Sequence, residues 1–208
     1  MTTEYQFHLI YGRTKMANVE MWFPVTIYRH PNLLPVDENN ALAEYCISLK
    51  NKTPQGGSDW VGGTYNTHGT HDISKDSNFS NILEVIAKHV NDFARMHNSE
   101  DTYKLDYAWL NIATAGDYQE FHTHNGNVFS AVYYVAAPPG SGKIVFEDPK
   151  EPDMLPLRKV SDKNTLSYTR ISYEATQGTL LIFRSYLRHL VEGGTNSDPR
   201  ISLALNFK

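Results

Sequence analysis

Three residues that can bind a metal ion stand at alternate positions in the stretch EFHTHNG. Alternate side chains of an extended strand project from one face, so Glu120, His122 and His124 are expected to share one side of a sheet. Same-face positions lie about 6–7 Å apart along a straight strand, so at most two of them are expected to bind one ion. We prefer His122 with His124, because Asn125-Gly126 begins a turn that can curl the second ligand inward, and Glu120 remains the alternative.

A second group of chemically useful residues lies near the C-terminus. His189 precedes Arg200 by eleven residues, with the turn GGTNSDP between them, so two strand ends can bring both into one cavity. Arg200 and Ser202 alternate with apolar residues, and an arginine facing the interior needs an anionic partner. Together they suit one end of a dicarboxylate, which would bind the guanidinium fork and one hydroxyl. The alternative is a structural ion pair of Arg200 with Asp198 or Glu192.

The two histidine regions can form a single metal site. His122 and His124 on one strand face, together with His189 on another strand, would leave three coordination positions of an ion open. This geometry is typical of non-haem Fe(II) oxygenases, in which two histidines and one carboxylate are usual. The open positions can accept a bidentate co-substrate and then O2.

Two segments in the N-terminal half have the apolar spacing of helices. Residues 36–51 are expected to form one helix, capped by Asp37, and residues 78–98 a longer one. The apolar positions are Leu42, Tyr45 or Cys46, and Leu49 in the first, and Ile82, Val85, Ile86, Val90 and Phe93 in the second. Residues 21–30 are expected to be an edge strand because of Pro24, and the Gly-rich residues 56–76 a long surface loop near a functional face.

From Tyr107 onward the chain consists of short strand-like runs separated by Gly, Pro, Asn and Asp. Many short strands with turn signals indicate a sandwich or barrel of the jelly-roll, cupin-like kind. Helices first and strands afterwards predict a mainly β, α+β fold with the helices packed outside a β core. The runs cover residues 107–114, 127–137, 142–148, 164–174, 178–183, 186–193 and 200–207.

Composition limits the class of protein. The chain has 208 residues, 40% of them hydrophobic, and a net charge of -4, which predict a single domain without a nucleic-acid-binding patch. Its one cysteine, Cys46, excludes an internal disulfide and a thiolate cluster and is expected to be a small core residue. The first residues lack a secretory leader and no apolar run could cross a membrane, so a cytoplasmic location is expected.

Four stretches together resemble the Fe(II)/2-oxoglutarate-dependent dioxygenases, in particular the 2OG-Fe(II) oxygenase family and the prolyl 4-hydroxylases. They are WLNIATAGDYQEFHTHNGNVFSAVYYV, APPGSGKIVFEDP, GTLLIFRSYLRHLVEGG and PRISLALNF, and the resemblance covers roughly residues 105–208. It implies a double-stranded β-helix core, with residues 1–104 packed on residues 105–208 as one domain. It also implies Fe(II), 2-oxoglutarate and O2 as cofactor and co-substrates.

The resemblance also implies the roles of individual residues. His122, His124 and His189 would bind the iron, and Arg200 would bind the distal carboxylate of 2-oxoglutarate with help from Ser202. Asn111 and Tyr133 or Tyr134, preferably Tyr134, would line the cavity. The departure is His124, which stands where an aspartate is usual and would leave Fe(II) with one more unit of positive charge.

The function that follows is substrate hydroxylation coupled to decarboxylation of 2-oxoglutarate to succinate and CO2. The alternatives are a cupin-like three-His enzyme that does not use 2-oxoglutarate, and a non-catalytic binding module on the same barrel. The substrate, a small molecule or a peptide, is not identified, and a homo-oligomer is left open. His68 and His71 are expected to contact substrate or solvent rather than metal, and the aromatic cluster of Tyr103, Tyr107 and Trp109 to belong to the core.

Overall fold

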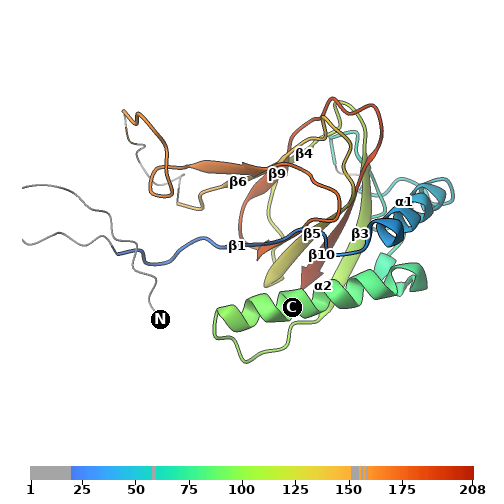
Figure 1. Cartoon of the computed structure of the whole chain (residues 1–208), viewed down its shortest axis with the longest axis horizontal. Helices are drawn as coiled ribbons and strands as arrows, with labels where there is room; N and C mark the ends of the chain where they lie inside the picture. Colours follow the sequence, from blue (N-terminus) through green and yellow to red (C-terminus); the bar gives the residue numbers. More distant parts are fainter. Residues whose placement is uncertain (1–19, 58–59, 151–154, 156, 158) are drawn as a thin grey trace, which may run out of the picture.

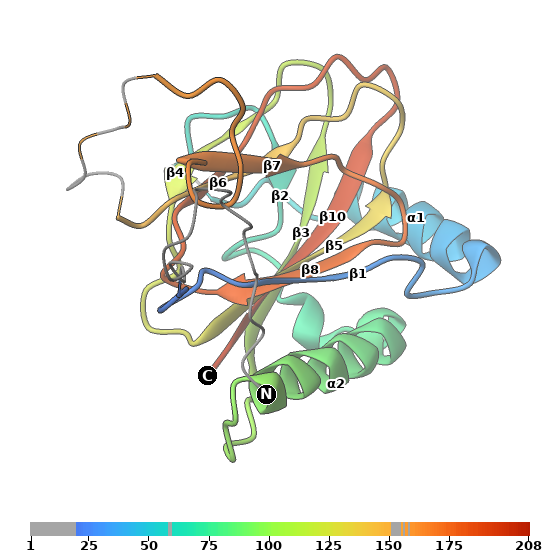
Figure 2. The same cartoon turned by 60° about the vertical axis from the view of Figure 1, so that its left-hand side comes forward.

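The computed structural model describes residues 20–57, 60–150, 155, 157 and 159–208, which form two antiparallel sheets flanked by helices (Figures 1 and 2). The order of the larger sheet is β1 (Ile27–His30), β8 (Leu180–Arg184), β5 (Phe129–Ala136), β10 (Arg200–Phe207), β3 (Leu105–Ala113) and β2 (Tyr65–Asn66). The order of the smaller sheet is β4 (Gln119–His122), β9 (His189–Val191), β6 (Ile144–Glu147) and β7 (Arg170–Tyr173). The predicted mainly β architecture with flanking helices is therefore present.

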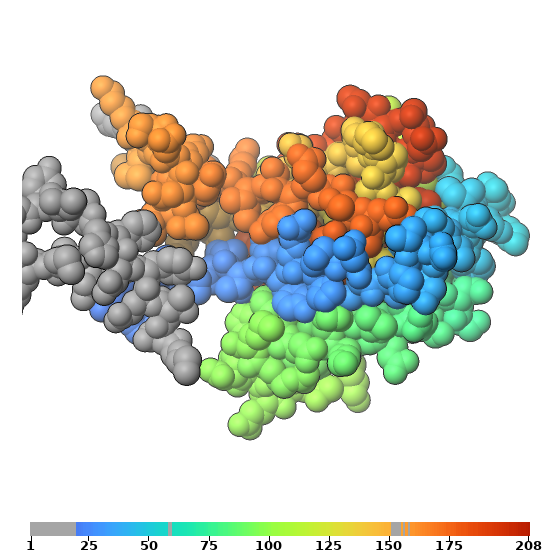
Figure 3. Space-filling view, viewed as in Figure 1, coloured from blue at the N-terminus to red at the C-terminus, as the bar shows by residue number. Residues whose placement is uncertain are grey.

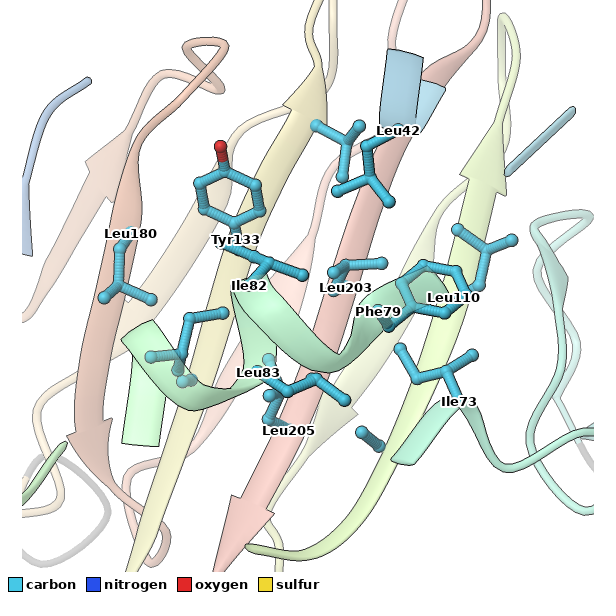
Figure 4. Close-up of a cluster of buried hydrophobic side chains, with 14 of the residues drawn as sticks. Leu42, Ile73, Phe79, Ile82, Leu83, Leu110, Tyr133, Leu180, Leu203 and Leu205 are labelled. Carbon is cyan, nitrogen blue, oxygen red and sulfur yellow. The ribbon is translucent and has the colours of Figure 1, made fainter. Parts of the chain in front are cut away.

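Two α-helices cover one face of the larger sheet. They are α1 (Val36–Lys50) and α2 (Ser80–Met96), and the short 3-10 helices η1 (Ile73–Lys75) and η2 (Ser77–Phe79) precede α2. Figure 3 shows the β1–α1 segment and α2 packed side by side along this part of the molecule. In Figure 4 the side chains of Leu42, Ile82 and Leu83 face those of the strands beneath them, and all belong to one buried apolar cluster. Burial of this cluster is the main force that holds the helices on the sheet.

The helices differ in detail from the sequence-based expectations. Asp37 does not cap α1, because the helix already begins at Val36 after Pro35, and no side chain caps it. Asp37 lies instead in the first turn, where a negative charge interacts favourably with the helix dipole. Cys46 rather than Tyr45 is fully buried on the inner face, as expected of a core thiol, and burial raises its pKa to about 12. In α2 the buried stripe includes Leu83, whereas Val85 is only half-buried.

The last strand shows why the alternation of its residues matters for function. β10 lies between β5 and β3 in the larger sheet, and every one of its residues is buried. Ile201, Leu203, Leu205 and Phe207 belong to the apolar cluster beneath the helices. Arg200, Ser202 and Ala204, on the other face, line a cavity between the two sheets. Because both faces of the sheet are covered, the alternation of residues in β10 gives one apolar face toward the helices and one polar face toward the cavity.

The segment 56–76 is only partly the surface loop that its composition predicted. Tyr65 and Asn66 form β2, which pairs with β3 at the edge of the larger sheet, and both are buried. Its glycines allow close backbone contacts, since a Cβ atom on Gly62 would lie 1.9 Å from the carbonyl oxygen of Tyr118. The edge position predicted for residues 21–30 is confirmed for residues 27–30, which form β1, whereas residues 21–26 are not in a strand. In the described part of the chain, no helix has the length and apolar character needed to span a membrane.

Candidate functional site

Three histidines from two strands and a turn meet between the sheets. The ring centroids of His122 and His189 lie 4.2 Å apart, and those of His124 lie 5.0 Å and 5.2 Å from them. One nitrogen of each ring falls within 4.8 Å of the others, and no further group of this kind occurs among the described residues. The structure therefore brings the three predicted metal ligands into one place.

The local fold explains this arrangement. His122, at the end of β4, pairs directly with His189, at the start of β9. The chain then leaves the strand, and the backbone N–H of His124 donates to the carbonyl of Ser185 at 3.0 Å. Asn125 and Gly126 form the turn that the sequence predicted, and Gly126 adopts a φ of +90°, which favours glycine. The turn moves His124 out of line with the strand and toward the other two rings.

Hydrogen bonds define the proton position on two of the rings. Nδ1 of His122 lies 2.7 Å from the carbonyl oxygen of Glu120, and Nδ1 of His189 lies 2.9 Å from that of Leu187. A carbonyl can only accept, so each Nδ1 carries the proton and each Nε2 keeps its lone pair for a metal. Burial lowers the pKa of all three histidines, that of His124 to about 3, so the rings are neutral near pH 7.

Glu120, the alternative ligand, is used elsewhere. Its carboxylate accepts hydrogen bonds from the backbone N–H groups of Val61 and Gly62, at 2.9 Å and 3.2 Å, and from the side chain of Gln119. The pairing of β4 with β9 shifts register between Gln119 and His122, so the regular alternation that would have aligned Glu120 with the histidines is interrupted. Glu120 therefore holds the loop before β2 and is not among the grouped ligands.

Arg200 is a buried cation for which the described residues provide no anionic partner. Its side chain donates from Nη1 to the carbonyl of Gly142 at 3.0 Å, while its buried Nε has no hydrogen-bond partner. Within the part of the chain that the structure describes, Arg200 forms no ion pair, and neither Asp198 nor Glu192 pairs with it. Burial lowers the pKa of Arg200, yet an arginine remains charged near neutral pH. Such a group is unfavourable unless an anion binds beside it.

Arg200 and the histidines line the same cavity. The cavity is also lined by Ser202, Asn111 and Tyr134, as expected from the sequence. Tyr133 instead points to the helix side, where its hydroxyl donates to Asn39 of α1 at 2.7 Å. Burial raises the pKa of Tyr134 to about 12, so its phenol stays protonated and can donate a hydrogen bond. The cavity thus has three histidine nitrogens that could hold a metal ion at one place, and at another a cation with polar neighbours and no ion-pair partner among the described residues.

An aromatic wall lies beside His124, and the sequence reasoning mostly missed it. Trp109 packs 5.8 Å from His124 and contacts Trp60, His68 and Tyr107 at centroid distances of 6.4, 5.2 and 6.0 Å. Trp109 is buried, as a core assignment predicted, but neither Trp109 nor Tyr107 belongs to the apolar cluster beneath the helices, because both share a face of β3 with Asn111, which lines the cavity. That alternation was readable from the sequence, whereas nothing local to Trp60 indicated its position.

Tyr103, His71 and His68 are the remaining aromatic and histidine residues that the sequence singled out. Tyr103 packs on Phe129 at 4.9 Å, on the helix side of the sheet, as expected of a core residue. His71 lies 3.2 Å from a carboxylate oxygen of Asp76, which also accepts from the hydroxyl of Tyr45 at 2.6 Å. His68, by contrast, is exposed against the aromatic wall.

Comparison with known proteins bears on both fold and chemistry. Residues 107–206, which span β3 to most of β10, match the family described as "Putative 2OG-Fe(II) oxygenase". A search of curated proteins finds no match to the chain.

Solved structures resemble the whole arrangement. A prolyl-4-hydroxylase of Pseudomonas putida is 15% identical, with a TM-score of 0.62 over 88% of this chain and 92% of that one. A viral collagen prolyl hydroxylase of Paramecium Bursaria Chlorella virus-1, in a 2OG complex, is 14% identical, with a TM-score of 0.55 over 87% and 94%. An epimerase of nogalamycin biosynthesis, in complex with Fe3+, alpha ketoglutarate and nogalamycin RO, is 13% identical, with a TM-score of 0.62 over 88% and 78%. At these identities the likeness shows the fold, a double-stranded β-helix as predicted.

Proposed function

We propose, from the match of residues 107–206 to the 2OG-Fe(II) oxygenase family, that this protein hydroxylates a substrate with Fe(II), 2-oxoglutarate and O2. The family match supports an oxidoreductase of this cofactor class, and the hydroxylation is our more specific inference. The observation that carries it is the buried Arg200, which pairs with no carboxylate among the described residues, in the cavity that the three histidines line. A cation held in this way fits an anionic co-substrate that reaches from the arginine to a metal.

His122, His124 and His189 are proposed to hold the iron. The donor set fits the metal, because three neutral imidazoles converge and two have Nε2 free. When bound, iron supplies the redox chemistry by which 2-oxoglutarate is decarboxylated to succinate and CO2 while the substrate is oxidised. Three protein ligands would leave coordination positions of the ion open for 2-oxoglutarate and O2.

Arg200 and Ser202 are proposed to bind the distal carboxylate of 2-oxoglutarate. The bond from Arg200 to the Gly142 carbonyl fixes the guanidinium and leaves Nε free to donate to a carboxylate. Ser202 follows on the same face of β10 and offers a hydroxyl. Asn111 and the protonated phenol of Tyr134 add further polar groups to the cavity wall. These donors would orient the co-substrate and exclude water from around it.

The primary substrate is proposed to lie against the wall formed by Trp60, His68, Tyr107 and Trp109. Trp109 of this wall lies 5.8 Å from His124 and 5.2 Å from His68, so a group stacked on the wall beside Trp109 would lie next to the metal position. Among the described residues that line the cavity, Arg200 is the one charged side chain. A small molecule or peptide side chain with an apolar or ring-shaped reactive part therefore suits this surface.

A second function is favoured by one observation. The third ligand is a histidine and not a carboxylate, which also fits a cupin-like three-His enzyme that does not use 2-oxoglutarate. In that case Arg200 would bind an anionic substrate directly. The two functions differ in whether 2-oxoglutarate binds to the metal-loaded protein.

The test compares 2-oxoglutarate binding and consumption. Anaerobic addition of Fe(II) and then 2-oxoglutarate should change the visible absorption of the wild-type protein, and succinate release across a panel of peptides and metabolites should identify the substrate class. Arg200→Ala should abolish the change at the same 2-oxoglutarate concentration. Arg188→Ala, on a half-exposed arginine that pairs with Glu147, is the matched control and should keep it. Iron binding with no response to 2-oxoglutarate would reject this function and favour the second one.

A further inference from the structure

His124 differs from the other two histidines in what faces its Nδ1 atom. Nδ1 of His122 and of His189 lies against a backbone carbonyl. Nδ1 of His124 lies 3.5 Å from the side-chain amide nitrogen of Asn206, a residue of β10 that is 8% exposed. A backbone carbonyl fixes one tautomer, whereas a side-chain amide can present either a donor or an acceptor.

The amide belongs to a buried hydrogen-bond chain. Oδ1 of Asn206 accepts from the hydroxyl of Ser130 at 2.8 Å, and that hydroxyl lies 2.8 Å from the hydroxyl of Ser185. Ser130 and Ser185 are each 1% exposed, so their hydroxyls must find partners within the protein. Ser185 also accepts the backbone N–H of His124 through its carbonyl, so the chain of contacts begins and ends at that histidine.

This orientation of the amide does not favour metal binding through Nε2. At 3.5 Å the amide nitrogen, which only donates, faces Nδ1 of His124, so a hydrogen bond between them would have Nδ1 accept and place the proton of the neutral ring on Nε2. A protonated Nε2 has no lone pair for a metal. Half a turn of the amide would bring Oδ1 toward Nδ1 and move the ring proton there. Ser130 would then accept from the amide nitrogen and donate to Ser185, which hydroxyl groups permit.

We propose that Asn206 is a positioning residue for the third metal ligand, whose amide turns on metal loading to accept the Nδ1 proton of His124. Ser130 and Ser185 accommodate the turn because each hydroxyl can exchange its donor and acceptor roles. The side-chain amide thus does for His124 what backbone carbonyls do for His122 and His189: it directs Nε2 to the metal. The inference rests on the metal role proposed above for the three histidines.

The direct test is the tautomer of each histidine in the zinc-loaded, full-length protein, because zinc is diamagnetic. Long-range proton–nitrogen correlation spectra distinguish protonated from metal-bound imidazole nitrogens. We expect His122, His124 and His189 each to show a protonated Nδ1 and a zinc-bound Nε2. Zinc on Nδ1 of His124, or no zinc on that ring, would overturn the proposal even where the variants below lose affinity.

Variants of the amide supply the second measurement, which is metal affinity by chelator competition. Asn206→Leu should weaken zinc and iron binding about 10–100-fold, the usual effect of removing a partner behind a metal-ligating histidine. Asn206→Asp keeps an acceptor and should restore the affinity and the Nδ1 proton signal. Asn39→Leu removes a buried asparagine that bonds to Val135 and Tyr133 on the helix side, so it should lower the melting temperature without changing metal affinity.

The outcomes separate this inference from the proposed function. An affinity for Asn206→Leu within twofold of wild type, in a folded protein, would reject the role of Asn206 while leaving the metal site intact. If the wild-type protein bound neither zinc nor iron, the metal site itself would fail. If Asn206→Leu does not fold, the wild-type tautomers and the Asn206→Asp variant decide the question.

Discussion

Replacing Arg200 by alanine tests the central feature of the cavity. Arg200 is 4% exposed, and among the described residues its Nε has no partner and its one side-chain hydrogen bond is to a backbone carbonyl. Most of its donor capacity is therefore free for a ligand. Removing one partner of a buried, charge-assisted pair raises the free energy of binding by about 2–5 kcal/mol. At 1.4 kcal/mol per decade, the dissociation constant of 2-oxoglutarate should rise roughly 30-fold to 4,000-fold.

The same substitution should have a small effect on the ligand-free protein. Arg200 forms no ion pair within the described residues, so alanine leaves no buried carboxylate uncompensated. The loss is one hydrogen bond to Gly142, about 0.5–1.5 kcal/mol, offset by removal of a desolvated charge. We expect a free energy of unfolding within about 2 kcal/mol of wild type. A larger loss would mean that Arg200 is a structural residue.

The assay titrates 2-oxoglutarate into the anaerobic, Fe(II)-loaded protein, with iron content measured in parallel. Arg200→Lys should recover only part of the affinity, because an ammonium lacks the fork that matches a carboxylate. Thermal shift gives an independent reading, since 2-oxoglutarate should raise the melting temperature of wild type and of Arg188→Ala much more than that of Arg200→Ala. An unchanged dissociation constant in Arg200→Ala would refute the assignment of this residue to the co-substrate.

Three further predictions concern the histidines. His189→Ala should lose iron and turnover while circular dichroism shows the fold retained, because two protein ligands hold the metal poorly, and full activity with normal iron content would contradict the site. His124→Asp should keep the iron, since a carboxylate adds attraction to Fe(II). Glu120→Ala should leave the iron content unchanged, because the Glu120 carboxylate binds the backbone of Val61 and Gly62. Iron loss in Glu120→Ala together with iron retention in His124→Ala would reverse the choice of ligand. In the metal-free protein the free energy of unfolding should fall as the pH drops from about 6.5 toward about 3. The reason is that the unfolded chain protonates His124 at its ordinary pKa of 6.5, whereas the folded chain protonates it only at about 3. Denaturant titrations in which the free energy of unfolding depends on pH no more steeply than that of a His124→Gln variant would contradict this prediction.

Local patterns in the sequence determined much of the fold. The period of two in residues 200–207 predicted that Arg200 and Ser202 would share a face opposite the apolar residues, and both line the cavity. Helical spacing located α1 and α2 to within a few residues, and Asn125-Gly126 predicted the turn that directs His124 toward the other rings. These features depend on residues close together in the chain, so their consequences can be read without knowing the tertiary contacts.

Other features depended on contacts between distant parts of the chain. The pairing of β4 shifts register between Gln119 and His122, so Glu120 is not grouped with the histidines. Its carboxylate instead accepts hydrogen bonds from the backbone N–H groups of Val61 and Gly62, before β2. Trp60 joins the cavity wall from that same region. Asn206 lies opposite Ser130 on β5, and its amide meets His124, which lies 82 positions earlier in the chain. Sequence periodicity determines which face a side chain occupies, but only closure of the two sheets decides which side chains meet there, because that depends on strand order and register.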